Sequence, residues 1–224
     1  MLRGLKKYLI NKSNVNVGKT SSEEIVSRRQ YRKYIGVISA SEAVGCTSMA
    51  VITATYLCHV RKKKVAVIEA GEKETFRKMA MHNDSRIINH YCHRMYGIDF
   101  FYSKVLRTTR DELKEIQVFR DYDYIILDYG KWSGNTFDEC IRCDVALMLG
   151  SLQPWKQKET YDILDKINGC EKGKICTSVL MIQGAKSDID KIKGCSKVKV
   201  LAMPHISDST RIDENLVGFF EKII

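Results

Sequence analysis

The chain has 224 residues, of which 44% are hydrophobic, and a formal net charge of +10. No apolar run approaches the ~18 residues of a transmembrane helix, and the basic start lacks the continuous apolar core of a signal peptide. Eight cysteines in a chain that can bury a sizeable core predict reduced thiols rather than a disulfide scaffold. We therefore expect a cytoplasmic protein, with peripheral contact at the inner face of the membrane as an open alternative.

The positive charge is concentrated near the N-terminus. Residues 1–34 hold nine basic and two acidic side chains, a net of +7, which leaves +3 for the other 190 residues. A nearly balanced body disfavours nucleic-acid binding over the whole surface. The sequence therefore divides into a basic tail, residues 1–33, and a globular domain, residues 34–224.

We predict helical structure in this tail. Leu2, Leu5 and Leu9 share one helical face, which predicts a short helix packed on the body. The alternative is an amphipathic contact with an anionic membrane surface. A capping box that begins at Ser21 predicts a second helix, which ends near Lys33.

The globular domain opens with a strand, a tight turn and a helix. Ile35–Ile38 is an apolar run, small residues follow from Ser39 to Gly45, and a helical run begins at Thr47. Backbone N–H groups converge at such a turn, and the dipole of the following helix favours an anion there. The sequence therefore predicts a phosphate site at the start of the domain.

This turn departs from the usual phosphate-loop motif, G-x-x-x-x-G-K-[ST]. In the frame from Ala40 to Thr47, Gly45 and Thr47 match the motif. Ala40 replaces the first glycine, and Cys46 replaces the lysine. A thiol at a helix N-terminus is expected to have a lowered pKa, so Cys46 is also a candidate reactive thiol.

The rest of the chain alternates between strands and helices. The predicted strands are Val65–Glu69, Ile98–Tyr102, Asp121–Gly130, Val145–Leu152, Ile175–Gln183 and Val198–Met203. The predicted helices are Glu72–Met81, Arg110–Phe119, Asn135–Cys143, Pro154–Ile167, Lys186–Ile192 and Asp213–Ile224. This alternation predicts one α/β domain, mainly a parallel sheet with helices on both faces. Gly45, Glu69 and Asp128 then lie at the carboxyl ends of strands, where such folds bind ligands.

With these strand ends in place, the chain resembles the ParA/MinD group of P-loop ATPases, which belong to the SIMIBI class. Residues 41–48 align without a gap with the group's variant motif K-G-G-x-G-K-[ST]-T. Residues 65–71, 122–130, 144–154, 180–184 and 200–208 are similar to later strands of the group. Within it, a short chain with an altered loop resembles the TadZ/CpaE type, which places Flp-type (Tad) pilus machinery at the cell pole.

The resemblance implies that the chain binds ATP or ADP with Mg²⁺ and forms a homodimer. Thr47 and Asp128 would contact Mg²⁺, and Asp128 is also the one candidate for a role in catalysis. Gln183 and Pro204 would border the base. The full set of implied nucleotide contacts is Glu42, Ala43, Val44, Gly45, Cys46, Thr47, Ser48, Gln183 and Pro204.

Several positions depart from the pattern of the group. The loop lysine is Cys46, and the signature lysine, which acts across the dimer in the group, is Ser41. The group's D-x-D strand end has Glu69 first and Gly71 second, so the acid that helps to orient water is missing. Phosphoryl transfer depends on fixed positive charge at the phosphates. We therefore expect binding through backbone amides, with little or no hydrolysis.

Other charges near the loop are open to two interpretations. Glu42 places a carboxylate in the loop, where it either repels phosphate or points to solvent. Lys73 and Lys131 follow strand ends and could replace the missing cation. Neither lies at a motif position, so we interpret both as surface lysines.

Three functions are consistent with the sequence. The first is an ATP-binding positioning or regulatory factor for a larger assembly, such as a Flp/Tad-type pilus or secretion machinery. The second is a scaffold that binds no nucleotide and works by protein contacts. The third is a DNA-associated partition ATPase, which the charge distribution disfavours. Cys140 and Cys143, together with the histidines near Cys92, are a weak candidate for a structural metal site.

Overall fold

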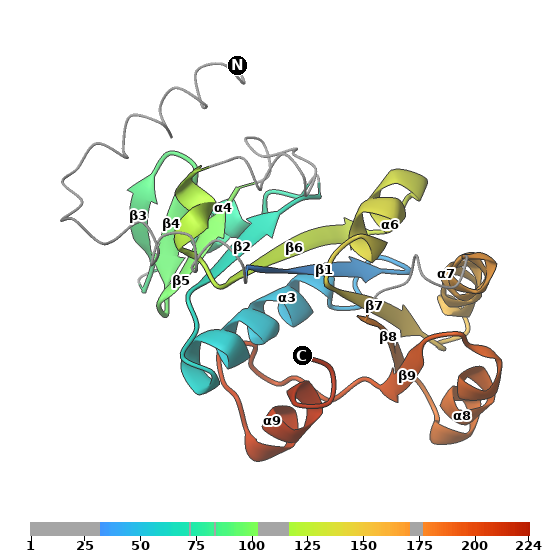
Figure 1. The fold of residues 1–224 in the computed structure, drawn as a ribbon. Helices are drawn as coiled ribbons and strands as arrows, with labels where there is room; N and C mark the ends of the chain where they lie inside the picture. The colour runs from blue at the N-terminus through green and yellow to red at the C-terminus, as the bar shows by residue number, and fades with distance from the viewer. Residues whose placement is uncertain (1–31, 72, 83, 103–116, 171–176) are drawn as a thin grey trace, which may run out of the picture.

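The computed structural model describes residues 32–71, 73–82, 84–102, 117–170 and 177–224. The predicted tail helices and most of the helix predicted for 110–119 lie outside the described residues. In the described part, one nine-stranded sheet forms the centre of the molecule, with helices on both sides (Figure 1). The prediction of a mainly parallel α/β fold is confirmed.

Every predicted strand of the domain is present, together with two that were not predicted. The strands are β1 (Lys33–Ser39), β2 (Val65–Glu69), β3 (Arg86–Asn89), β4 (Cys92–Met95), β5 (Ile98–Phe101), β6 (Tyr124–Lys131), β7 (Val145–Ser151), β8 (Thr177–Gln183) and β9 (Lys199–Ala202). Lys33 begins β1, so the helix predicted to end near Lys33 does not include this residue, and the rest of that prediction lies outside the described residues. Residues 117–121 form a 3-10 helix, so β6 begins later than predicted.

The sheet has the order β3-β4-β5-β2-β6-β1-β7-β8-β9. Neighbouring strands are parallel along the order β5-β2-β6-β1-β7-β8-β9, and β3 and β4 are added at one edge by antiparallel pairs. β1 lies between β6 and β7, at the point where successive crossovers lead to opposite halves of the sheet. The carboxyl ends of β1, β2 and β6 therefore meet at one edge, where α/β folds place their ligands.

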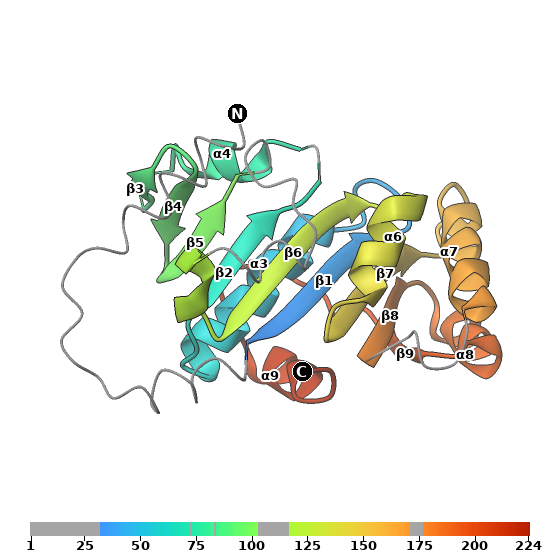
Figure 2. The same ribbon diagram turned by 45° about the horizontal axis from the view of Figure 1, so that its top comes forward.

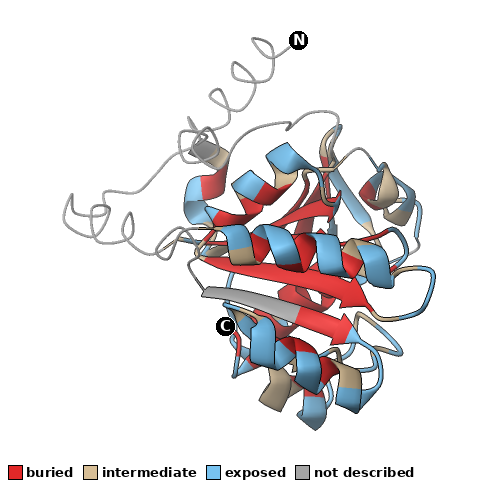
Figure 3. Cartoon of the chain, turned by 90° about the vertical axis from the view of Figure 1, so that its right-hand side faces the viewer, coloured by how far each residue is buried: buried red, intermediate tan, exposed pale blue. Residues whose placement is uncertain are grey.

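Two layers of helices cover this sheet. The helices are α3 (Cys46–Thr55), which continues as a π-helical turn (Tyr56–Val60), α4 (Thr75–Met79), α6 (Gly134–Ile141), α7 (Gln157–Gly169), α8 (Lys186–Cys195) and α9 (Glu214–Phe220). α3 and α9 lie on one face, and α6, α7 and α8 lie on the other (Figure 2). In Figure 3 the central strands are buried, whereas the outer sides of the helices are exposed. None of the described helices is both long and apolar enough to cross a bilayer.

The helix that follows the loop is unusually buried. Eight of the ten residues of α3 are buried, because this helix lies between the sheet and α9. Tyr56, at its C-terminal end, stacks on Phe220 of α9 with ring centroids 4.9 Å apart. Burial along its length fixes the helix axis, and with it the position of its N-terminus at the edge of the sheet.

Cys140 and Cys143 have a packing role in this structure. A Cβ atom added at Gly36 of β1 would lie 2.8 Å from Cys140 Sγ and 3.1 Å from Cys143 Sγ. Both thiols are fully buried and therefore fill the space above this glycine. In the described residues no group of three His, Cys, Asp or Glu side chains is placed to hold a metal ion.

Candidate functional site

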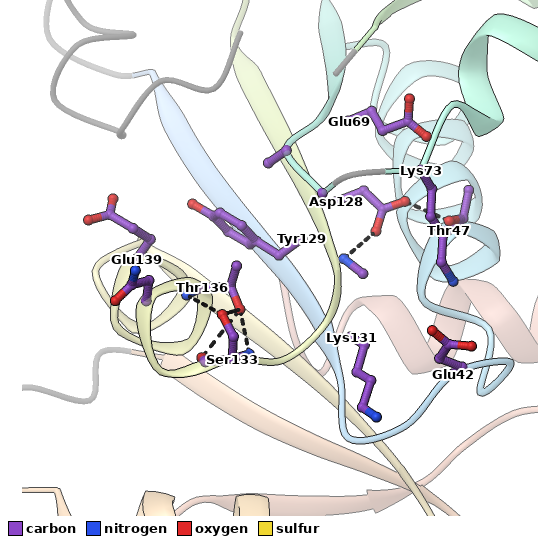
Figure 4. Close-up of a pocket in the computed structure, with 14 residues that line it drawn as sticks. Glu42, Thr47, Glu69, Lys73, Asp128, Tyr129, Lys131, Ser133, Thr136 and Glu139 are labelled. Atoms are coloured by element: carbon purple, nitrogen blue, oxygen red, sulfur yellow. Dashed lines mark hydrogen bonds between the residues drawn. The ribbon is translucent and has the colours of Figure 1, made fainter. Parts of the chain in front are cut away.

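A cavity of about 800 Å³ opens at the carboxyl edge of the sheet. Its walls come from the loop after β1, from the ends of β2 and β6, and from α6 (Figure 4). Glu42, Thr47 and Asp128, which the sequence singles out, all line this cavity. A concave site of this size can enclose a ligand as large as a nucleotide.

The loop forms an open helix N-terminus. Gly45, the residue before α3, has a φ of 97°, a left-handed conformation that glycine adopts without strain. No side chain caps this end of α3, so the orphan N–H groups of its first turn have no side-chain acceptor there. Ala43 also has a positive φ, 54°. Lys156, at the start of α7, donates from Nζ to the Ala43 carbonyl at 3.2 Å and fixes the outer part of the loop.

Asp128 is the centre of the polar contacts in the cavity. Thr47 Oγ1 donates to its Oδ2 at 2.6 Å, and the Gly130 backbone N–H donates to its Oδ1 at 3.0 Å. Cys46 Sγ donates to Oδ1 as well, at 3.1 Å. The carboxylate, only 3% exposed, is thus held by donors from both the loop helix and its own strand.

The structure contradicts the expectation of a reactive thiol at Cys46. The side chain turns away from the loop surface toward Asp128 and is only 8% exposed. Burial raises its pKa well above the ordinary value, and the neighbouring Asp128 carboxylate raises it further. Because the thiolate is the reactive form, Cys46 is a packed, neutral thiol rather than a nucleophile.

Glu69 and Gly71, at the end of β2, have structural roles here. Glu69 is 2% exposed, and its Oε1 accepts the Thr75 N–H at 2.6 Å, which fixes the start of α4. A Cβ atom at Gly71 would lie 3.0 Å from the Tyr129 carbonyl oxygen, so a side chain there would force the two backbones apart. The close approach of the two backbones therefore favours glycine, rather than an acidic residue, at position 71.

The remaining residues predicted to contact the nucleotide lie either in the loop and the start of α3 or at the ends of β8 and β9. Val44 is buried in the core on the α3 side of the sheet, while Ala43 and Ser48 are exposed. Gln183, at the end of β8, is exposed, and Pro204 follows β9. Neither of these two lines the cavity, which lies on the β6 side of the loop.

Ser41, at the position of the group's signature lysine, points into the protein. It is 5% exposed, and its hydroxyl has no hydrogen-bond partner among the described residues. A lysine in the same backbone position would have to turn its ammonium group out of this apolar environment. Residue 41 therefore provides no cation to the cavity.

The cavity is also lined by Lys73 and Lys131, which the sequence pattern indicated to be surface lysines. Lys156, which contacts the loop from outside the cavity, gave no signal in the sequence, since its contact joins residues 113 positions apart. Lys131 pairs with Ser39 after a register shift in the β1–β6 pair, so its place beside the loop depends on tertiary structure.

The residues present fit a magnesium–nucleotide complex. The Thr47 hydroxyl and the Asp128 carboxylate provide the oxygen donors that Mg²⁺ prefers. The open N-terminus of α3, a ten-residue helix, faces the same edge of the sheet, and its dipole favours a phosphate group.

Comparison with family models and with curated proteins gives no match. Comparison with solved structures gives several, all at low identity. A ParA family ATPase from Chlorobium tepidum has a TM-score of 0.50 and 15% identity, over 79% of this chain and 86% of that chain. The MinC:MinD cell division complex of Aquifex aeolicus has a TM-score of 0.54 and 16% identity, over 75% and 79%. A Borrelia burgdorferi B31 protein bound to AMPPNP has a TM-score of 0.56 and 14% identity, over 87% and 97%. The chain therefore has the fold of ParA- and MinD-type ATPases.

Proposed function

We propose that the chain binds ATP or ADP with Mg²⁺ in this cavity and hydrolyses ATP little or not at all. The observation that carries the proposal is the open N-terminus of α3 beside Thr47 and Asp128, whose side chains are 2.6 Å apart. A bound AMPPNP molecule in a neighbour of the same fold supports a nucleotide as the ligand. Mg²⁺, when bound, would neutralise phosphate charge at this point.

Weak hydrolysis follows from what the cavity lacks. The residue at the position of the loop lysine, Cys46, donates to Asp128 instead of facing the cavity. Position 71 has no side chain that could orient a water molecule, and the close approach to Tyr129 leaves no room for one. Without fixed charge and an oriented nucleophile, phosphoryl transfer loses its main sources of acceleration.

In this proposal the bound nucleotide controls how the protein meets its partners. The chain would position or regulate a larger assembly, with a Flp/Tad-type pilus or secretion system as the favoured example, and would act as a homodimer in the cytoplasm or at the inner face of the membrane. One neighbour of the same fold is a complex of MinD with MinC, which supports a protein partner.

The competing function is a scaffold that works by protein contacts without nucleotide. Large apolar side chains on the surface favour it: Met81 is 83% exposed, Trp155 is 72% exposed and Ile87 is 68% exposed. Such residues are common at protein interfaces. Both functions are compatible with this fold, so a measurement of nucleotide binding is needed to distinguish them.

Titration calorimetry with ATP and ADP, with and without Mg²⁺, tests the proposal. We expect the native chain to bind both nucleotides with Mg²⁺ and to release phosphate at no more than background rate. Asp128→Asn should weaken metal-dependent binding, whereas Asp138→Asn, an exposed change on α6, should leave it unaltered. Thermal unfolding of each variant checks its fold. If the native chain binds neither nucleotide, the proposal is wrong and the scaffold function is favoured.

A further inference from the structure

The cavity lacks the cation that phosphate loops normally provide. No basic residue occurs from Ser39 to Thr47, and the side chain at position 46 is turned toward Asp128. Carboxylates of Glu42, Glu69, Asp128 and Glu139 line the walls. Glu139 forms an ion pair with Arg142, whose Nη1 lies 3.0 Å from its Oε1. A polyphosphate in this environment therefore needs positive charge from outside the loop.

Lys131 is held directly beside the loop. It is the last residue of β6, and its partner in the sheet is Ser39, the last residue of β1. Two further hydrogen bonds lock this pairing: Trp132 N–H donates to the Ser39 carbonyl at 2.9 Å, and Ser39 Oγ donates to the Gly130 carbonyl at 3.2 Å. The register shifts just before this pair, where Gly130 has a φ of 68°. In Figure 4 the Lys131 side chain extends toward the loop.

Lys73 reaches the cavity from the end of β2. The N–H groups of Ala70 and Gly71 both donate to the Asp128 carbonyl oxygen, at 2.9 and 3.0 Å. These bonds draw the chain across the end of β6, and Lys73 follows two residues later. Its side chain extends between Thr47 and Glu42 in Figure 4.

Both ammonium groups are available to a ligand. Lys73 and Lys131 are exposed, and neither forms an ion pair with a described residue. Lys131 is paired in the sheet, and Lys73 follows two residues after the bonded Gly71, while each flexible stem lets the charge follow a phosphate oxygen. Two lysines on separate walls of one cavity can contact one polyanion from two sides.

We propose that Lys73 and Lys131 together replace the missing loop lysine and bind the phosphate groups of a nucleotide in this cavity. This inference rests on the proposed function, because it assigns the phosphate contacts of the same site. It differs from the interpretation of the two residues as surface lysines, which the sequence alone favoured.

Calorimetric binding of Mg²⁺–ATP and Mg²⁺–ADP to Lys73→Met, Lys131→Met and the double variant tests this assignment. We expect each single change to weaken binding by about 10-fold and the double change by about 100-fold, since charge-assisted hydrogen bonds have this strength. Lys73→Arg and Lys131→Arg should retain most of the affinity. Lys63→Met is the matched control, because Lys63 is an exposed lysine just before the opposite end of β2.

The outcomes separate this inference from the proposed function. If the native chain binds nucleotide and the double variant binds equally well, the lysine assignment is wrong and the proposed function remains. If Lys63→Met weakens binding as much as the cavity variants, the effect is one of overall charge, and the assignment is again wrong. If the native chain binds no nucleotide, the proposed function itself fails. An unchanged unfolding temperature shows that the variants are folded.

Discussion

His93 gives the structure a pH dependence that can be measured. This residue lies in β4 between the rings of Phe100 and Tyr102, with centroids 5.2 and 5.5 Å away and interplanar angles of 15° and 24°. Its side chain is fully buried, and neither ring nitrogen has a hydrogen-bond partner among the described residues. Burial lowers the pKa of His93 to about 4, and the partly opposing charge of Asp99 does not cancel this effect.

The sign and size of the effect follow from proton linkage. The unfolded chain binds a proton at its ordinary pKa of about 6.5, and the folded chain binds one only near the lowered value. Near neutral pH the histidine is uncharged in both states and contributes no difference. As the pH falls, the unfolded state takes up its proton first, so the free energy of unfolding decreases. At a pH of about 5 the loss from this one residue is about 2 kcal/mol.

Urea unfolding of the native chain and of His93→Phe, at pH values of about 7 and about 5, measures this contribution. Phenylalanine retains the stacked ring between Phe100 and Tyr102 but does not titrate. We expect the native chain to lose about 2 kcal/mol more than the variant between the two pH values. His205→Phe, at an exposed position, should behave as the native chain does. Equal losses in the native chain and in His93→Phe would refute the reasoning.

Two further predictions concern packing and thiol chemistry. Gly36→Ala should lower the free energy of unfolding by about 1–3 kcal/mol, because the added Cβ would lie 2.8 Å from Cys140 Sγ. Gly134→Ala is the control, since an added Cβ there meets no atom within 4 Å, and it should leave the free energy of unfolding unchanged. Thermal unfolding of the two variants measures the difference. Iodoacetamide should modify Cys46 much more slowly than the exposed Cys195, because burial and the Asp128 carboxylate raise the pKa of Cys46. Mass spectrometry measures both rates, and comparable rates would contradict the buried position of the Cys46 thiol.

The main course of the fold could be predicted from the sequence because most of its strands are apolar runs. β1, β2, β6 and β7 are buried over nearly their whole length, and such strands are continuous in the sequence. β3 and β4 have only four residues each, and β3 (RIIN) is a largely exposed edge strand without an alternating pattern. Their pairing with β5 depends on tertiary contacts, which short polar segments do not reveal.

The sequence predicted the sheet edge at which the cavity lies, but not the directions of its side chains. Placing Thr47 and Asp128 at one edge needed only the alternation of strands and helices. The orientation of Cys46 depends on a carboxylate 82 positions away, and a helix N-terminus alone predicted the wrong direction for its pKa. Lys131 depends on a register shift in the β1–β6 pair, which no local pattern contains.

The distribution of charge connects the fold to the proposed function. The described walls of the cavity carry more carboxylates than lysines: Glu42, Glu69, Asp128 and Glu139 line it together with Lys73 and Lys131. The carboxylates that face a free polyphosphate would repel it, whereas a magnesium complex carries its own compensating charge. Flexible lysines at strand ends can hold such a complex without the rigid geometry that a loop lysine provides for phosphoryl transfer. A site of this kind is suited to sense a metal–nucleotide complex and poorly suited to consume it.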